Sequence, residues 1–321
     1  MRLRPFAALS VAAVAAVLLA GCSGGGGDDP SPSASGAAAT DLCSAQAAPG
    51  AASDAVTVEG DPGTASTATF SAPLDVSALQ TTVISEGSGD PVSSGDFVSY
   101  ALTAYDAETG EKLVDTGYNP GELLPAQISA DNPLGQILGC GAPGERVVST
   151  FPATDSAAAE VYIVDLLSVV PTAAWGTEQA PVEGLPTVTL DADGTPTIAI
   201  DTAATPPTTT EVATLKKGDG YAVQSGDYVL IQYRGARWSS GELFEGGDTW
   251  NGGTPYAGQT TGFVPGFQKA LEGQTVGSQV LVVIPPADGY GEGEINETDL
   301  KGDTLVFVID IIGAQKAAAG Q

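Results

Sequence analysis

The chain of 321 residues contains no histidine. Histidine is the usual general base of hydrolytic triads, a common metal ligand and the side chain that exchanges protons most readily near neutral pH. Its absence excludes every triad, metal site and proton shuttle that depends on an imidazole. Any chemistry that this chain performs has to use other groups.

Basic residues are scarce as well. The chain has 11 Lys and Arg against 39 Asp and Glu, which gives a formal net charge of -28. A surface this acidic repels phosphate backbones instead of neutralising them, so we expect no nucleic-acid partner. The excess of carboxylates is more typical of a well-solvated surface than of a site for one specific cation.

Only three cysteines are present, and the first ends an N-terminal targeting pattern. Arg2 and Arg4 form a basic region, and residues 6–19 form an apolar run that is short for a membrane span of about 20 residues. The run ends in Leu-Ala-Gly-Cys22, which resembles a bacterial lipoprotein signal. The alternative is an ordinary secretory signal followed by a chance cysteine.

A low-complexity stretch follows Cys22 directly and favours the lipoprotein interpretation. We therefore expect residues 1–21 to be a signal peptide, Cys22 to be lipidated, and residues 22–54 to be a flexible tether. The expected location is outside the cytoplasm, anchored to the bacterial cell membrane.

The two remaining cysteines, Cys43 and Cys140, are expected to form a disulfide, because two leftover thiols in an oxidising compartment are more often paired than free. A metal site is the rival interpretation. Two cysteines without histidine provide too few ligands for it, so we expect no metal.

An internal repeat divides the chain into two domains. The segment Val92–Val98 recurs as Val223–Val229 at an offset of 131 residues, and the strand-like segment 162–167 recurs as 307–312 at an offset of 145. The offset grows from 131 to 145, so the second copy is longer by 14 residues. Gly144 aligns with Gly277 at an offset of 133, which places 12 of these 14 residues after Gly277. The second copy is therefore predicted to have a longer loop near its end, in the segment that contains Tyr290.

The expected domain boundaries follow from this repeat. We assign residues 55–171 to the first domain, 172–210 to a linker with leading strands, and 211–316 to the second domain. Both copies are rich in short β-branched runs, and Asp193-Gly194 is a hairpin signal. A short helix is predicted from Pro265, which suits a first helical position, to about Gly273.

Six short motifs of the second copy lie in a characteristic order. They are Tyr233-Arg234-Gly235, Leu243-Phe244-Glu245, Gly262-Phe263-Val264-Pro265-Gly266-Phe267, Val276-Gly277-Ser278, the segment from Ile284-Pro285-Pro286 to Gly289-Tyr290-Gly291, and Thr304-Leu305-Val306-Phe307. In order and spacing they resemble FKBP-type peptidyl-prolyl cis-trans isomerases, from about Tyr221 to Ala314.

The resemblance implies a fold of class α+β, with two FKBP-like units that are each a bent antiparallel β-sheet wrapped around a short α-helix. It also implies the residues of the catalytic pocket in the second unit, with no cofactor. These are Tyr233, Phe244, Glu245, Phe263, Val264, Phe267, Tyr290 and Phe307, with Tyr256 as a further, less certain substrate-binding residue.

The resemblance gives several of these residues a role. Phe267 is expected to form the floor of the pocket, and Glu245 an acidic group at its rim. The backbone N–H of Val264 and the hydroxyl of Tyr290 are expected to hold the ligand. The alternative is that the aromatic residues are ordinary core and that Glu245 is a solvated charge.

The chain also departs from the family pattern. Phe267 stands where the family most often has tryptophan, Glu245 where aspartate is usual, and Thr298 and Asp299 where apolar residues are common. The first copy departs further, with Leu102 and Val114 at two pocket positions, Leu134 at a third, and no Tyr290 loop. It is expected to keep the fold without the active site, either binding unfolded chains or serving as a spacer.

The predicted function is isomerisation of X-Pro bonds in unfolded or secreted polypeptides outside the cytoplasm, as a folding catalyst. Rotation about this bond makes and breaks no covalent bond, so no nucleophile or metal is required. The alternative is a catalytically weak FKBP-like chaperone or peptide-binding surface module, and a third interpretation is a scaffold. The resemblance makes macrolide inhibitors a candidate ligand, which the sequence leaves open.

Overall fold

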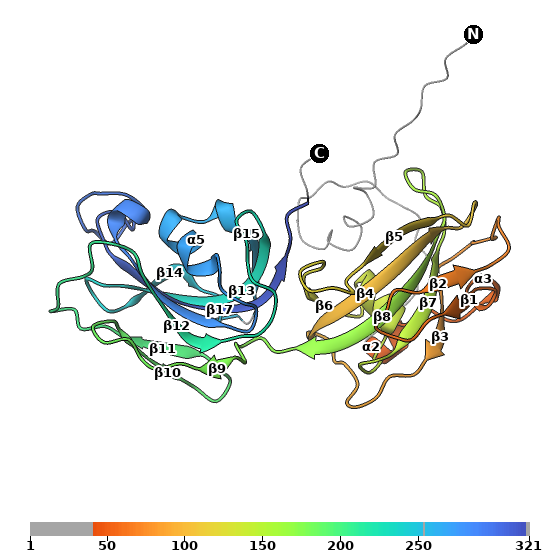
Figure 1. The fold of residues 1–321 in the computed structure, drawn as a ribbon, viewed down its shortest axis with the longest axis horizontal. Helices are drawn as coiled ribbons and strands as arrows, with labels where there is room; N and C mark the ends of the chain where they lie inside the picture. The colour runs from red at the N-terminus through yellow and green to blue at the C-terminus, as the bar shows by residue number, and fades with distance from the viewer. Residues whose placement is uncertain (1–40, 253, 319–321) are drawn as a thin grey trace, which may run out of the picture. The chain divides into compact units, whose positions relative to one another are not determined.

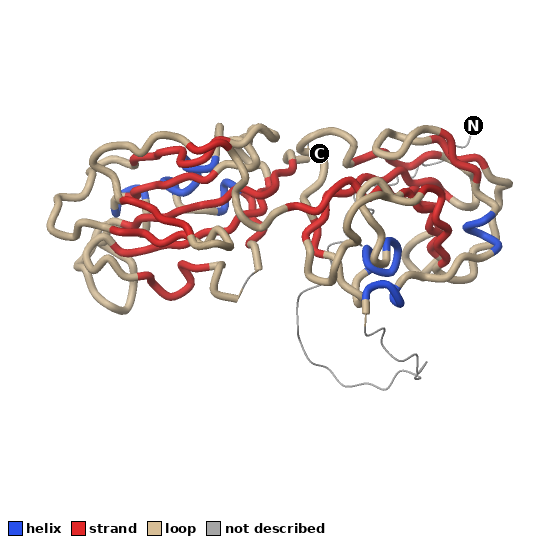
Figure 2. Tube along the Cα trace, turned by 90° about the horizontal axis from the view of Figure 1, so that it is seen from below, coloured by secondary structure: helices blue, strands red, loops and turns tan. Residues whose placement is uncertain are grey.

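The computed structural model describes residues 41–252 and 254–318, which form two compact units (Figure 1). Unit 1 runs to Tyr118 and continues over Ala126–Val169, and unit 2 combines Asn119–Pro125 with the chain from Val170 onward. The signal peptide and Cys22 lie outside the described residues. Within the described ranges, no helix has the length and apolar character needed to span a membrane. Both units are rich in strands and have only short helices (Figure 2).

Unit 1 is built on a six-stranded antiparallel sheet of order β3-β7-β8-β4-β5, with β6 paired to β4. Its strands are β3 (Gln80–Ser85), β4 (Phe97–Asp106), β5 (Lys112–Thr116), β6 (Ala126–Gln127), β7 (Arg146–Phe151) and β8 (Glu160–Val170). One helix, α4 (Pro133–Leu138), is capped by the Asn132 side chain, which accepts a hydrogen bond from the Gly135 N–H.

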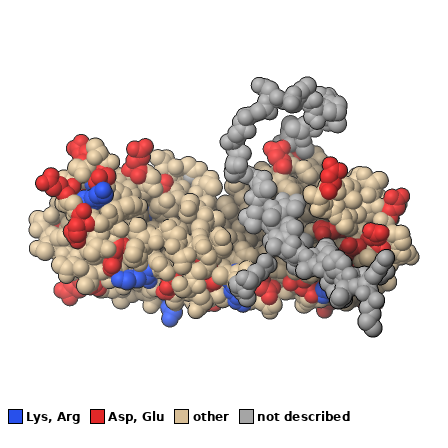
Figure 3. All heavy atoms as spheres, turned by 90° about the horizontal axis from the view of Figure 1, so that it is seen from above, with Lys and Arg blue, Asp and Glu red and all other residues tan. Residues whose placement is uncertain are grey.

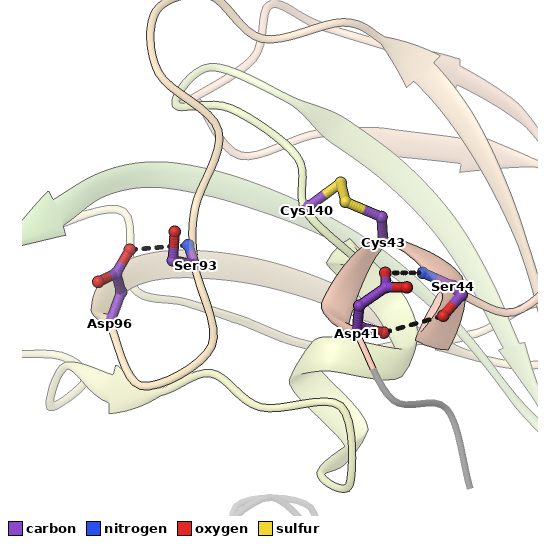
Figure 4. Close-up of a disulfide and its surroundings, with 6 residues drawn as sticks. All are labelled: Asp41, Cys43, Ser44, Ser93, Asp96 and Cys140. Carbon is purple, nitrogen blue, oxygen red and sulfur yellow. Dashed lines mark hydrogen bonds between the residues drawn. A yellow bond between two sulfur atoms is a disulfide. The ribbon is translucent and has the colours of Figure 1, made fainter.

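The start of unit 1 differs from the sequence prediction. Residues 41–54, assigned above to the flexible tether, contain the short helices α2 (Leu42–Ala45) and α3 (Ala51–Asp54), and Leu42 and Ala52 are buried. The expected disulfide joins Cys43 on α2 to Cys140 beyond α4, across 97 residues of sequence (Figure 4). The cross-link and the buried side chains make this segment part of the folded unit.

A second layer covers the outer face of the unit 1 sheet. The hairpin of β1 (Thr57–Glu59) and β2 (Thr67–Thr69) packs there, and Arg146 of β7 holds it in place. The Arg146 guanidinium is buried, pairs with Asp165 at 2.6 Å, and donates hydrogen bonds to the carbonyls of Gly60 and Thr64. A buried ion pair of this kind fixes a geometry more than it adds stability.

Unit 2 has a seven-stranded antiparallel sheet of order β14-β13-β17-β16-β12-β9, with β15 paired to β13. Its strands are β9 (Thr177–Glu178), β12 (Glu211–Lys217), β13 (Tyr228–Arg237), β14 (Leu243–Asp248), β15 (Tyr256–Gln259), β16 (Gln279–Ile284) and β17 (Leu305–Gln315). Helix α5 (Pro265–Leu271) follows the 3-10 turn η2 (Thr260–Gly262), and η3 (Pro286–Asp288) follows β16.

Both faces of the unit 2 sheet are covered. Helix α5 packs through Phe267, Ala270 and Leu271 on one face. The opposite face carries the hairpin of β10 (Thr187–Leu190) and β11 (Pro196–Ala199), as Figure 1 shows. The hairpin predicted around Asp193-Gly194 is therefore present. The segment 172–210, taken in part as a linker from the sequence, packs its hairpin on the sheet of unit 2.

The two units repeat backbone details at the predicted offsets. The Gly144 N–H donates to the Leu166 carbonyl, and the Gly277 N–H donates to the Ile311 carbonyl, both at 2.7 Å. The loop between β7 and β8 has eight residues, whereas the loop between β16 and β17 has twenty. The difference of 12 lies in the loop that contains Tyr290, as the sequence predicts.

Acidic side chains outnumber basic ones on the surface. In the view of Figure 3, acidic side chains are spread over the visible face and clearly outnumber lysine and arginine. Several basic side chains form ion pairs with carboxylates. In unit 1 these are Lys112 and Arg146, and on the sheet of unit 2 they are Arg234 and Arg237. Much of the scarce positive charge is therefore already paired.

Candidate active site

An aromatic cluster lies between helix α5 and the sheet of unit 2, with Phe267 at its centre. The Phe267 ring stacks on Phe263, with centroids 4.7 Å apart. It meets Phe307 of β17 at 5.1 Å and Tyr233 of β13 at 5.8 Å, both edge to face. Such arrangements are favoured by the charge distribution of aromatic rings. Phe267 is only 4% exposed, so it forms the floor of the cluster.

Two further rings extend the cluster toward solvent. Phe244 of β14 packs against Phe307 at 5.6 Å, and Tyr256 of β15 contacts both Tyr233 and Phe263. Tyr256 is 48% exposed, so it lies at the rim. Tyr256 was the less certain residue in the sequence analysis, and its ring lies beside the other aromatic residues.

Glycine makes room for these rings. A Cβ atom at Gly235 would lie 2.6 Å from the Phe307 ring and 2.8 Å from Phe244, and one at Gly247 would lie 2.7 Å from Phe244. Carbon atoms do not approach this closely without displacement of a neighbour. The motif Tyr233-Arg234-Gly235 therefore supplies one ring and the space for two others.

The start of helix α5 sets the position of Phe267 and leaves a donor free. Val264 is the N-cap residue, and its carbonyl accepts hydrogen bonds from the N–H groups of Phe267 and Gln268, both at 3.0 Å. Pro265 follows at the first helical position, where its missing N–H is not needed. Among the described residues, the N–H of Val264 has no hydrogen-bond acceptor. It can therefore bind the carbonyl of a ligand.

The long loop between β16 and β17 carries Tyr290. The N–H of Gly291 donates to the Pro286 carbonyl and that of Gly302 to the Gly291 carbonyl, so both ends of the Tyr290 turn are fixed. Farther along the loop, the Arg237 guanidinium of β13 binds the carbonyls of Asn296 and Asp299. Tyr290 itself is 50% exposed, and its hydroxyl has no partner among the described residues.

The hydroxyl of Tyr233 remains protonated near neutral pH. Burial raises its pKa above the ordinary tyrosine value, and the carboxylate of Asp248 acts in the same direction. The hydroxyl donates to the Gly246 carbonyl at 3.3 Å.

The acidic residue expected at the rim, Glu245, makes no contact that would fix it. Its side chain is exposed and has no hydrogen-bond or ion-pair partner in the described part of the chain. The ordered carboxylate of this strand is Asp248, which pairs with Arg234 at 2.9 Å. Sequence reasoning missed this pair, although both residues lie in or beside the motifs that identify the pocket.

The sequence-predicted pocket residues thus come together from five elements and two loops. Tyr233, Phe244, Phe263, Phe267 and Phe307 are in direct ring contact, and Val264 and Tyr290 lie at the helix start and in the loop. The stacking of Phe263 on Phe267 was not foreseen. The spacing of four residues between them, across a helix start, is the signal that could have suggested it.

Unit 1 has no equivalent cluster among its described residues. Leu102 lies on β4, Val114 on β5 and Leu134 on α4, in the elements that correspond to those of the pocket. The one ring at a pocket position, Tyr162, packs instead against Phe151 at 5.3 Å. Neither unit, within the described ranges, has a group of three or more acidic or cysteine side chains that could hold a metal ion.

Comparison with known proteins assigns the family. The family model of the FKBP-type peptidyl-prolyl cis-trans isomerases matches residues 220–312. A protein of Streptomyces anulatus named FK506-binding protein is 33% identical over 112 residues, which are 33% of this chain and 86% of that protein. A Corynebacterium glutamicum protein of the same kind is 32% identical over 108 residues, which are 34% of this chain and 89% of that protein.

The chain therefore belongs to the family of FKBP-type peptidyl-prolyl cis-trans isomerases, which makes it an isomerase that acts on proline-containing polypeptides. Among solved structures, the three FKBP domains of a wheat protein align over 75% of this chain and 96% of that chain, with 17% identity and a TM-score of 0.30.

Proposed function

We propose that unit 2 isomerises X-Pro bonds of unfolded or secreted polypeptides outside the cytoplasm and so acts as a folding catalyst. The observation that carries this proposal is the aromatic enclosure around Phe267, with the unpartnered N–H of Val264 at its edge. An apolar pocket with one or two positioned polar groups fits a prolyl ring and the carbonyl next to it.

The chemistry requires only this environment. The planar amide resists rotation with a barrier of about 20 kcal/mol, because rotation interrupts its resonance. The twisted amide has lost the charge separation of the planar form, so a dry aromatic enclosure favours the twisted state over the planar one. In the proposed arrangement the Val264 N–H holds the ligand carbonyl, and the Tyr290 hydroxyl supplies a second hydrogen bond.

The anchoring and the role of unit 1 belong to the same proposal. Lipidation at Cys22, supported by the sequence pattern that precedes it, would keep the enzyme at the outer side of the cell membrane. We propose that unit 1 is a second FKBP-like unit without the active site. Its sheet order, the position of helix α4 between β6 and β7 and the repeated glycine hydrogen bonds support this proposal.

The aromatic pocket is also the proposed site for macrolide inhibitors. The similar Streptomyces anulatus protein carries the name FK506-binding protein. We extend that ligand to this chain as a proposal, and inhibition of its isomerase activity by FK506 tests it.

A proline-peptide isomerisation assay on the mature chain tests the enzymatic proposal. The chain is expected to accelerate the reaction, and Phe267→Ala to reduce kcat/KM by about tenfold or more, because the floor of the pocket is lost. Tyr290→Phe is expected to reduce it by about fivefold, the effect of one hydrogen bond of roughly 1 kcal/mol.

Two controls accompany this assay. Tyr162→Phe, at the strand position of unit 1 that corresponds to Phe307, should leave the rate unchanged. Tyr290 is half-exposed, so Tyr290→Phe should not affect folding, and it remains informative if Phe267→Ala unfolds. A wild-type rate equal to the uncatalysed rate would refute the proposal.

A catalytically weak chaperone or peptide-binding module is the second candidate. The observation that favours it is exposed apolar surface on unit 2, where Tyr256 of β15 and Tyr290 and Ile295 of the β16–β17 loop are 48%, 50% and 57% exposed. Exposed apolar surface of this kind binds unfolded chains. Suppression of client aggregation by a chain that does not accelerate isomerisation would support this candidate over the enzyme.

A further inference from the structure

The carboxylate of Asp288 ties the turn that carries Tyr290 to helix α5. We propose that Asp288 is a positioning residue, which holds the Tyr290 hydroxyl in a fixed place relative to the Val264 N–H. This inference rests on the proposed isomerase function, in which these two groups hold the ligand. Asp288 itself touches no ligand in this arrangement and acts through Tyr290.

The position of Tyr290 depends on the 3-10 turn η3. The Pro286 carbonyl, in η3, accepts hydrogen bonds from the N–H groups of Gly289 at 3.1 Å and Gly291 at 2.8 Å, and these two glycines flank Tyr290. The Tyr290 hydroxyl has no hydrogen-bond partner among the described residues. Whatever fixes η3 therefore also fixes the place from which this hydroxyl reaches a ligand.

Asp288, the last residue of η3, binds two other elements through one oxygen atom. Its Oδ2 accepts a hydrogen bond from Nζ of Lys269, on helix α5, at 2.8 Å. The same Oδ2 accepts a hydrogen bond at 2.5 Å from the hydroxyl of Thr210, which directly precedes β12. Helix α5 is the helix that Val264 caps. One carboxylate therefore joins the turn that carries Tyr290 to the helix that begins after Val264.

Close packing brings the same two elements together. A Cβ atom at Gly266, in the first turn of helix α5, would lie 2.4 Å from Cγ2 of Ile284, and one at Gly289 would lie 3.5 Å from the same atom. The helix start and the backbone next to Tyr290 thus pack on one side chain, at the end of β16. Small displacements of hydrogen-bonding groups have large effects on rate, so a shift of η3 should be felt in catalysis.

The ion pair is suited to restrain geometry without deciding whether unit 2 folds. The side chains of Lys269 and Asp288 are 58% and 29% exposed, and ion pairs near the surface contribute little to stability. The hydrogen bonds from Lys269 and Thr210 lower the pKa of Asp288, so its carboxylate stays ionised near neutral pH. Removing the carboxylate should release the turn and leave the fold intact.

Isomerisation of a proline peptide by the mature chain, followed by NMR exchange, tests this role. Asp288→Ala is expected to reduce kcat/KM by about fivefold, the factor expected for Tyr290→Phe, because a displaced hydroxyl is as ineffective as a missing one. The double variant, Asp288→Ala with Tyr290→Phe, should also lose about fivefold, since the first residue acts through the second. Independent effects would multiply to about 25-fold.

Three further variants serve as controls. Glu292→Ala removes a carboxylate equally far along the chain on the other side of Tyr290. Glu292 is exposed and has no partner among the described residues, so this variant should keep the wild-type rate. Lys269→Arg keeps a cationic donor and should also keep it, whereas Lys269→Met should lose about twofold, because Thr210 remains as a donor. If Asp288→Ala lowered the unfolding midpoint, Lys269→Met, at an exposed helix position, would carry the test.

The outcomes separate this inference from the isomerase proposal when the affinity for the same peptide is measured alongside the rates. Wild-type activity of Asp288→Ala, or a double variant that loses about 25-fold, would overturn the positioning role and leave the isomerase proposal intact. Binding without acceleration by the wild type would overturn the isomerase proposal. The positioning role then predicts the same pattern of losses in affinity, and an unchanged affinity of Asp288→Ala would overturn it. A chain that neither binds nor accelerates the peptide would overturn both.

Discussion

Phe267, the residue at which the family pattern leads us to expect tryptophan, is paired with a second aromatic ring. Phe263 and Phe267 stack at an interplanar angle of 20°, so the pair offers a continuous aromatic surface at the floor. Two phenylalanine rings offer no N–H to a ligand. In the proposed arrangement, the Val264 N–H and the Tyr290 hydroxyl supply the hydrogen bonds instead.

Asp310 is a residue whose environment predicts a pH effect. Burial raises its pKa to about 6, although the Ala174 N–H, the Gln279 amide and Lys216 act in the opposite direction. A carboxyl whose pKa is higher in the folded state stabilises that state fully below its unfolded value, and this contribution is lost as the pH rises. The free energy of unfolding of unit 2 should therefore fall by roughly 2 to 3 kcal/mol between about pH 4 and pH 6.

Asp310→Asn should remove this slope, because asparagine is neutral throughout and Gln279 can turn its amide to accept a hydrogen bond from it. All three tryptophans of the chain, Trp175, Trp238 and Trp250, lie in unit 2, so denaturation followed by tryptophan fluorescence reports this unit alone. The same slope in the variant and in the wild type would contradict the prediction.

At the level of elements, the β16–β17 loop distinguishes unit 2, which has the proposed site, from unit 1, which is proposed to lack one. Replacing residues 287–302 with a Gly-Ser-Gly-Ser link would give this loop the eight-residue length that it has in unit 1. We expect isomerase activity to fall at least tenfold, because Tyr290 is removed. The unfolding midpoint by tryptophan fluorescence should change little, since most of the replaced residues are exposed. Retained activity would show that the loop is dispensable.

The sequence predicted some elements well because their signals are local. The hairpin at Asp193-Gly194 follows from its turn residues, and the helix from Pro265 follows from its capping pattern and buried face. The face of the sheet on which each of these two elements packs depends on strands that are distant in the sequence. Helices α2 and α3 were missed because their alanine-rich residues resemble a linker, and a disulfide and packing stabilise them instead.

Prediction of the site had a similar limit. The family motifs contain every ring of the cluster except Tyr256, which lies outside them and was the less certain assignment. The ion pair of Arg234 with Asp248 and the bonds of Arg237 to the loop join segments far apart in sequence, and no periodicity marks them. Similarly, nothing in the local sequence links Arg146 to the hairpin carbonyls of Gly60 and Thr64.

At the scale of the whole molecule, the two units should respond separately to loss of the disulfide. Cys43→Ser with Cys140→Ser removes a cross-link over 97 residues. The free energy of unfolding of unit 1 should fall by roughly 2 to 5 kcal/mol. Calorimetry should therefore show an earlier transition, while the tryptophan signal of unit 2 stays unchanged. Ser44→Ala is the control for local disturbance, and a shift of the tryptophan signal would contradict the prediction.

The hairpin on the outer face of unit 2 affects how this unit can be assembled during synthesis. Residues 187–199 emerge before the strands that they cover, and a two-stranded hairpin is marginally stable alone. Its partners include Leu281 and Val283 of β16 and Val306 of β17, about a hundred residues later. Strand β17 also lies between β13 and β16, so the sheet closes only when the last strand arrives. A nascent chain of this protein therefore exposes the apolar face of this hairpin until translation has passed residue 315, and we expect aggregation of the unfolded chain to start there.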